Sequence, residues 1–163
     1  KTEIAGHAFY TVASKLSSHE KGRNIFLHLA KEELDHIWVI SRIADSLKSG
    51  EGWIDYEEAL KRAMLTGQSL PIFQADNELI NRLEGDPTDT NAVNIAIENE
   101  EDAVEFYLRL LREAQTPTEK VVLTRLLEME KGHLKILRWE SESLRKTGFW
   151  GDTMEFSVEK ETD

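Results

Sequence analysis

Residues 126–137 read LLEMEKGHLKIL, and this stretch decides the fold. Its apolar residues recur in steps of three and four, which is typical of a helix that packs one face into a core. The seam of this helix runs Leu123, Leu126, Glu130, His133, Leu137. Glu130 and His133 lie three residues apart, so they share one face of the helix, one turn from each other. The stretch therefore predicts a core helix that carries two polar side chains into the core.

The same pattern occurs earlier in the chain, at a constant offset of 97 residues. Eight residues are identical over the 50 that can be compared, and five of them form one pattern: Glu, five residues, Phe-Tyr, 22 residues, then Glu-x-x-His. The identical pairs are Glu3/Glu100, Phe9/Phe106, Tyr10/Tyr107, Leu29/Leu126, Glu33/Glu130, His36/His133, Ser46/Ser143 and Leu47/Leu144. The chain is thus predicted to contain two copies of one unit, related by approximate two-fold symmetry.

The apolar periodicity predicts an all-α fold with four long helices. They run from the start of the chain to about Leu16, from about His19 to Lys48, from Asp86 to about Ala114, and from Thr116 to near Lys146. The loops between the first two helices and between the last two are short, so each pair should form an antiparallel hairpin. We expect a four-helix bundle made of two helical hairpins joined by a long crossover.

Three cap signals support these helix starts. Ser17 and Glu20 have the spacing of a capping box. Asp86-Pro87 is predicted to be an N-cap followed by proline at the first helical position. The stretch Thr116-Pro117-Thr118-Glu119 repeats that arrangement.

The crossover spans about residues 49–85 and contains many apolar residues. We interpret it as carrying short helices near Tyr56–Leu65 and Ala75–Leu83. Residues 1–148 are then one bundle domain, and residues 149–163 are a C-terminal tail whose aromatic start is expected to dock.

Composition excludes several classes of function. The 163 residues contain no cysteine, which rules out disulfides, thiolate metal sites and thiol catalysis within them. The net charge of −11 disfavours nucleic acid as a partner. No stretch has the roughly 20 apolar residues of a membrane helix. We expect a cytoplasmic protein that binds neither nucleic acid nor membrane.

The buried seams hold four carboxylates and no basic residue. On the second long helix the seam runs Phe26, Leu29, Glu33, His36, Ile40, Ile43, Leu47, and the first and third helices place Glu3 and Glu100 on theirs. Burying four unpaired carboxylates would cost several kcal/mol each. Two divalent cations would neutralise them, and two neutral histidines would complete the donors. Oxygen-rich ligation with some imidazole suits iron or manganese, with zinc as a plausible occupant.

This double motif resembles the rubrerythrin-type proteins of the ferritin-like superfamily over all four helices. The resemblance implies a non-haem di-iron centre that reacts with O2 or H2O2. It implies that Glu3 and Glu100 are the lone carboxylates, and that Glu33 with His36 and Glu130 with His133 are the paired ligands. By analogy, Glu33 and Glu130 would bridge two iron ions. Tyr10 and Tyr107 match the tyrosines next to such centres, where a hydroxyl bound to a carboxylate is favoured over a redox role.

The chain departs from rubrerythrins in two respects. It lacks the cysteine-rich rubredoxin-like segment, and Ala103 stands where those proteins usually carry an extra Glu. The six remaining ligands would then form a symmetric site like that of bacterioferritin-type centres. His7 lies one turn after Glu3 and is expected to be a hydrogen-bonded histidine rather than a seventh ligand.

The leading functional interpretation is an oxidoreductase that reduces peroxide or O2, in the context of oxidative stress, with electrons from an external donor protein. The alternatives are a ferroxidase that oxidises Fe²⁺ for storage or delivery, and a structural role for the metal. We expect a homodimer. Because a ligand at position 3 would lie on a frayed first turn, we also expect at least one further turn upstream in the natural protein.

Overall fold

The computed structural model describes residues 2–66 and 76–151, and within them every regular element is a helix. The six helices are α1 (Thr2–Leu16), α2 (Glu20–Ser49), α3 (Tyr56–Thr66), α4 (Glu78–Gly85), α5 (Asp89–Glu113) and α6 (Pro117–Thr147). The four long helices agree with the predicted ranges to within about three residues. The all-α fold class predicted from the sequence is confirmed.

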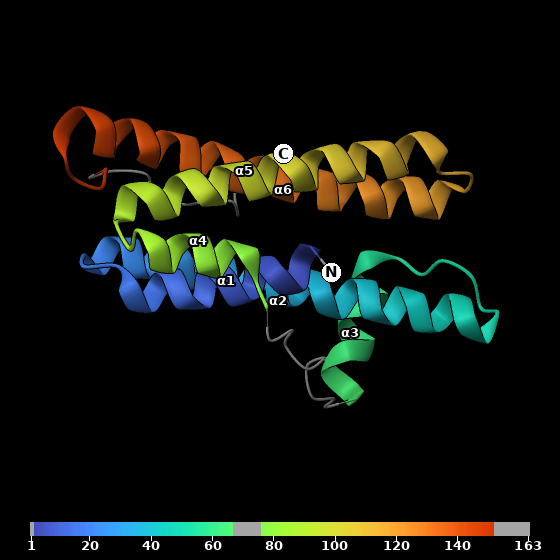
Figure 1. Ribbon diagram of the computed structural model, residues 1–163. Coiled ribbons are helices and arrows are strands. Elements are labelled where there is room, and N and C mark those ends of the chain that lie inside the picture. The colour runs from blue at the N-terminus through green and yellow to red at the C-terminus, as the bar shows by residue number, and fades with distance from the viewer. Residues whose placement is uncertain (1, 67–75, 152–163) are drawn as a thin grey trace.

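The long helices pair as two hairpins, α1 with α2 and α5 with α6, which lie as two layers (Figure 1). Helix α4 contacts α1 and α5 and leads directly into the second hairpin, whereas α3 packs against α2. Helix α1 has 15 residues and α2 has 30, so α1 begins near the middle of the bundle. This start places Glu3 level with the centre of the longer helices.

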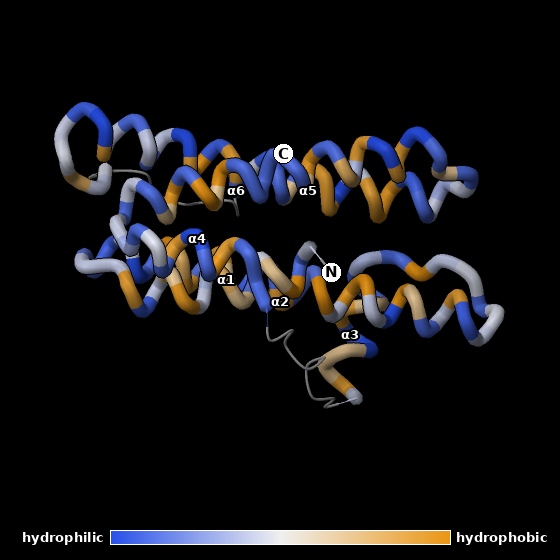
Figure 2. Tube along the Cα trace, viewed as in Figure 1, coloured by the Kyte–Doolittle hydropathy of each residue, from blue (hydrophilic) through white to orange (hydrophobic). Residues whose placement is uncertain are grey.

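The core consists of two apolar clusters, one toward each end of the bundle. The first contains Phe9, Tyr10, Phe26, Leu137 and Trp150, and the second contains Val39, Tyr56, Tyr107, Leu123 and Leu126. Figure 2 shows hydrophilic residues across the middle of α5 and α6, between more hydrophobic stretches on either side. The bundle therefore has a polar layer between two hydrophobic ones.

The crossover contains two short helices, as the sequence suggested. Helix α3 coincides closely with the predicted segment, and α4 begins after an N-cap at Asn77, whose side chain accepts from the backbone N–H groups of Leu79 and Ile80. The predicted start at Ala75 lies outside the described residues. So do residues 152–163 of the tail. Trp150, in the described part of the tail, is buried against Phe26 with ring centroids 5.7 Å apart.

Two of the three predicted caps are wrong. Ser17 does not cap α2, because its backbone N–H closes the last turn of α1 on Ala13; the N-cap is His19, which makes no side-chain cap bond. Asp86 likewise closes α4 through Leu83, and Thr88 caps α5. In both places the backbone N–H of the predicted cap residue closes the last turn of the preceding helix. The third signal is a full capping box between Thr116 and Glu119.

The predicted seam of α2 is wrong at two positions in its second half. Ile40 and Leu47 are 36% and 45% exposed, and Val39 and Ser46 are buried instead, whereas Ile43 is buried as predicted. An α-helix has 3.6 residues per turn, so a seam drawn in steps of three and four drifts around a straight helix. Beyond the start of α1, moreover, α2 packs against α3, so its buried face changes direction.

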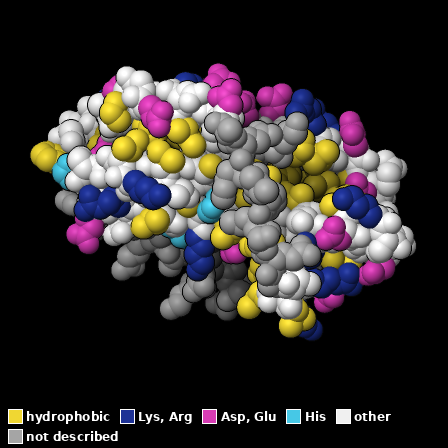
Figure 3. All heavy atoms as spheres, turned by 60° about the horizontal axis from the view of Figure 1, so that its bottom comes forward, with side chains coloured by type: hydrophobic (Ala, Val, Ile, Leu, Met, Phe, Trp, Pro, Cys, Tyr) yellow, Lys and Arg dark blue, Asp and Glu magenta, His cyan; other side chains and the backbone are white. Residues whose placement is uncertain are grey.

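The surface mixes charges of both signs. Figure 3 shows basic and acidic side chains interspersed with hydrophobic ones on one face of the molecule. Within the described residues, no helix combines the length and the apolar composition needed to cross a membrane.

Candidate metal centre

All six predicted ligand residues meet in the polar layer. Helix α1 contributes Glu3 and α5 contributes Glu100, while α2 and α6 each contribute a Glu-x-x-His pair. Glu3 is 7% exposed, and the other five are between 0% and 3% exposed: Glu33, His36, Glu100, Glu130 and His133. No Lys or Arg forms an ion pair with them among those the structure describes. This is an unusual concentration of buried charge for a helical core.

The donor atoms form two overlapping groups, in each of which they lie within 4.8 Å of one another. One group contains Glu3, Glu33, His36 and Glu130, and the other contains Glu33, Glu100, Glu130 and His133. Glu33 and Glu130 belong to both groups. The arrangement therefore offers two adjacent metal positions with two shared carboxylates.

Both histidines turn the same nitrogen, Nδ1, toward the carboxylates. His36 Nδ1 lies 3.0 Å from Glu130 Oε1 and 3.5 Å from Glu3 Oε2. His133 Nδ1 lies 3.2 Å from Glu130 Oε2 and 3.4 Å from Glu33 Oε1. We therefore expect Nδ1 to be the metal donor of each imidazole.

The residues fit a metal pair, because their inward-facing atoms lack hydrogen-bond partners. Seven buried atoms of these residues make no bond of good hydrogen-bond geometry with any described residue: Glu33 Oε1, His36 Nδ1 and Nε2, Glu100 Oε2, Glu130 Oε1 and Oε2, and His133 Nδ1. Several lie within about 3.5 Å of one another, so distance is satisfied but direction is not. Buried polar atoms nearly always have a hydrogen-bond partner. All of these seven atoms except His36 Nε2 point at a common centre, as metal ligands do.

Two tyrosines hold the lone carboxylates in a reciprocal arrangement. The Tyr10 hydroxyl on α1 donates to Glu100 Oε1 on α5, and the Tyr107 hydroxyl on α5 donates to Glu3 Oε1 on α1. Both rings are buried. The predicted contact between hydroxyl and carboxylate is present at both positions, and it crosses between the hairpins each time.

A comparison with protein families now bears on this geometry. The rubrerythrin family model matches residues 1–140. The chain belongs to the rubrerythrin family. Comparisons with curated proteins and with solved structures gave no significant match. Family membership indicates a di-iron protein with an oxidoreductase-type role, and the buried carboxylate and histidine cluster is suited to bind the metal.

In this rubrerythrin-family chain, the metal-free centre carries protons where metal ions would bind. Burial alone lowers the pKa of His36, but its interactions with Glu130 and Glu3 dominate and raise it to about 10. The pKa of His133 is raised well above its ordinary value, because interactions with Glu100 and Glu130 outweigh burial. Both imidazoles are therefore protonated at neutral pH.

The four carboxyl groups divide into two kinds. Burial raises the pKa of Glu33 well above its ordinary value and that of Glu100 to about 7. Burial also acts to raise the pKa of Glu130 and Glu3, but the histidines overcome it and lower both values. Two carboxylates thus face two imidazolium ions, and the metal-free cluster is close to neutral.

One functional contact was missed by sequence reasoning. The Glu32 carboxylate on α2 lies 2.6 Å from His133 Nε2 on α6, the nitrogen that faces away from the centre. Glu32 directly precedes Glu33, so a second acidic residue beside the motif was the available signal. Because Glu32 lies off the apolar seam, its position alone gave no sign of a buried partner.

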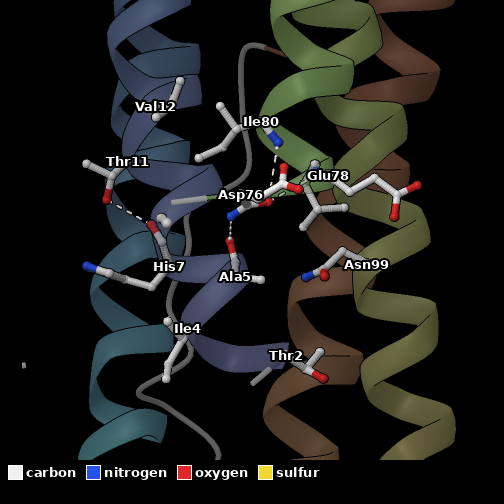
Figure 4. Close-up of a pocket in the computed structure, with 13 residues that line it drawn as sticks. Thr2, Ile4, Ala5, His7, Thr11, Val12, Asp76, Glu78, Ile80 and Asn99 are labelled. Carbon is white, nitrogen blue, oxygen red and sulfur yellow. Dashed lines mark hydrogen bonds between the residues drawn. The ribbon is translucent and has the colours of Figure 1, made fainter. Parts of the chain in front are cut away.

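Two cavities flank the centre along α1. One of about 240 Å³ reaches Glu3 and Tyr107, and its wall includes the apolar side chains of Ile37, Ile40 and Phe106. The other, of about 590 Å³, lies between α1, α4 and α5 and has Asn99 at its edge (Figure 4).

His7 does not belong to either group of donors. Its Nδ1 lies 2.6 Å from the Ala30 carbonyl oxygen, which is the bonded role expected for it.

Proposed function

We propose that this protein is a non-haem di-iron oxidoreductase that reduces H2O2 or O2 with electrons from an external donor protein. The observation that carries the proposal is the buried cluster of four carboxylates and two histidines, in which seven side-chain atoms have no hydrogen-bond partner among the described residues. Two bound iron ions would supply the two electrons that, together with two protons, reduce one H2O2 to two water molecules. The family match supports the oxidoreductase role.

The chain's own residues divide the work. Glu33 and Glu130 would each serve both metal positions, while Glu3 and Glu100 would each serve one. The tyrosine hydroxyls keep one oxygen of Glu3 and of Glu100 engaged, so that the other oxygen is directed inward. The two apolar clusters on either side keep bulk water away from the layer.

The access route favours a small neutral reactant. The cavity that reaches Glu3 is lined by Ile4, Ile37, Ile40 and Phe106, with Thr2 and Ser41 as its polar residues besides Glu3 and Tyr107. A hydrated Fe²⁺ ion would have to shed water against apolar side chains there, which costs far more than the few hydrogen bonds that H2O2 would lose, and O2 would lose none. This lining supports oxidant reduction over ferrous-iron uptake.

Electrons must come from outside these 163 residues. Without cysteine they hold no iron–sulfur or rubredoxin-type site. Repeated turnover therefore depends on a donor protein, whereas without one the reaction would stop after one oxidation of the metal pair.

The test is anaerobic loading with Fe²⁺, elemental analysis, and stopped-flow mixing with H2O2 and with O2. We expect two iron ions per chain, rapid oxidation by at least one oxidant, and multiple turnovers only when a reductant is supplied. Loading in air should not raise the iron content beyond the two ions. An iron content far above two per chain, inside a large hollow particle, would replace this proposal with iron storage.

A further inference from the structure

We propose that Glu32 makes the two metal positions unequal, so that the position containing His133 binds its ion more tightly than the position containing His36. The inference rests on the proposed function, since it requires a metal pair. It concerns Glu32 as a positioning residue, which acts on the metal through His133 and does not touch the metal itself.

Glu32 is held on both sides. Its Oε2 lies 2.6 Å from Nε2 of the buried His133, and its Oε1 lies 3.5 Å from Nε2 of His28, which is about half exposed. The first contact joins α2 to α6 across the two hairpins. A carboxylate placed in this way accepts the Nε2 proton of His133 and leaves Nδ1 to face the centre.

His36 has no equivalent support. Its Nε2 is fully buried and has no hydrogen-bond partner among residues 2–66 and 76–151. The internal repeat explains the difference, because the residue 97 positions after Glu32 is Met129. Methionine offers only a weakly accepting thioether, and Met129 packs against the second apolar cluster.

At the two lone carboxylates the outer contacts are matched. Tyr10 bonds to Glu100 as Tyr107 bonds to Glu3, so each lone carboxylate has a phenol partner. The replacement of Glu32 by Met129 in the second copy is therefore the difference that distinguishes the two histidines. An outer carboxylate fixes the tautomer and orientation of a ligating histidine and increases its basicity; its loss typically lowers metal affinity about 10- to 100-fold.

The experiment is a calorimetric titration of metal-free protein with Co²⁺, followed in parallel by the visible absorption of bound cobalt. We expect two binding steps of one ion each, with the first about 10- to 100-fold tighter than the second. Two equal sites would overturn the inference and leave the proposed function intact. Failure to bind any Co²⁺ would count against both.

Two reciprocal substitutions assign the steps. Glu32→Met should weaken the tight step about 10- to 100-fold and bring the two affinities together. Met129→Glu supplies His36 with a carboxylate and should tighten the weak step. Glu32→Gln retains an accepting oxygen and should lose less than Glu32→Met, which separates a positioning role from loss of folding. A tight step unchanged in Glu32→Met would refute the inference.

Glu128→Met is the matched control, because Glu128 is an exposed carboxylate on α6 whose contact is with Lys131. Both cobalt affinities should be the same as in the original protein. Circular dichroism and thermal melting of each metal-free variant verify that the bundle is folded. A Glu128→Met effect as large as that of Glu32→Met would show that surface charge, not contact with His133, sets the affinity.

Discussion

Loading the centre with two divalent ions at pH 7 should expel about three to four protons per chain. In the metal-free cluster, His36 and His133 each carry one proton more than a neutral imidazole does. The pKa of His36 is raised to about 10, and the pKa of His133 is raised well above its ordinary value. Burial raises the pKa of Glu33 well above its ordinary value, which favours its protonated form. Glu100, with a pKa raised by burial to about 7, is protonated in about half of the molecules.

Each of these protons occupies a group that a metal ion needs. Metal binding requires neutral imidazole and ionised carboxylate, so all four groups must give up a proton. Glu130 and Glu3 contribute none, because their pKa values are lowered. Charge balance agrees with this number. Two divalent ions bring four positive charges, so a cluster that is close to neutral before and after loading must release about four protons.

The assay is calorimetric titration with Zn²⁺ in several buffers of different ionisation enthalpy. The slope of the observed enthalpy against the buffer enthalpy gives the number of protons released. That number should fall by about one between pH 6 and pH 8, as Glu100 loses its proton in the metal-free protein. Release of less than about one proton at pH 7 would refute the assignment of protons to these groups.

The same protons make the metal-free protein less stable at high pH. A group whose folded pKa is raised stabilises the folded chain below its unfolded pKa and loses that contribution as the pH rises through the folded value. For Glu100 the window runs from 4.5 to about 7, and for His36 from 6.5 to about 10. Urea unfolding of metal-free protein at pH 5.5, 7 and 9 should show stability falling, and a rise would contradict it.

Three further predictions concern single substitutions. Glu130→Ala should abolish one metal position and disturb the other. Glu119→Ala should leave the metal content unchanged and cost about 1 kcal/mol of stability, because a helix cap is lost. Elemental analysis and denaturation measure the two effects, and an equal loss of metal from both variants would contradict the ligand assignment. Tyr10→Phe removes the donor to buried Glu100 and should cost about 1–3 kcal/mol in metal-free unfolding, so an unchanged midpoint would argue against this bond. Gly132→Ala adds a methyl group that meets nothing within 4 Å inside a helix and should stabilise the protein by about 1 kcal/mol, and a lower melting temperature would contradict this.

The sequence was sufficient for what depends on periodicity and repetition. Four helices, their pairing and the convergence of six polar residues follow from apolar seams in which Glu and His replace core residues. The capping box at Thr116 was also readable, because both of its partners lie within four residues and neither of them closes the last turn of α5.

What the sequence could not reveal depends on contacts between distant residues. Ser17 and Asp86 looked like caps in isolation, but each is already used by the helix before it. The buried face of α2 moves away from Ile40 because the neighbouring helix changes from α1 to α3, and no local sequence pattern encodes that change. Glu32 escaped notice because its partner is 101 residues away and the repeat does not conserve it.

The shared carboxylates have a consequence for how such a molecule is assembled. Each metal position takes three of its four residues from one hairpin and the fourth from the other: Glu130 completes the first position, and Glu33 completes the second. A single hairpin of this design therefore carries every kind of donor, namely a lone Glu and a Glu-x-x-His pair. Two identical hairpins facing each other would form both metal positions. The information for a complete binuclear site fits into about a third of the chain. The crossover, besides packing α3 and α4 against the bundle, turns an association between two molecules into a folding step within one.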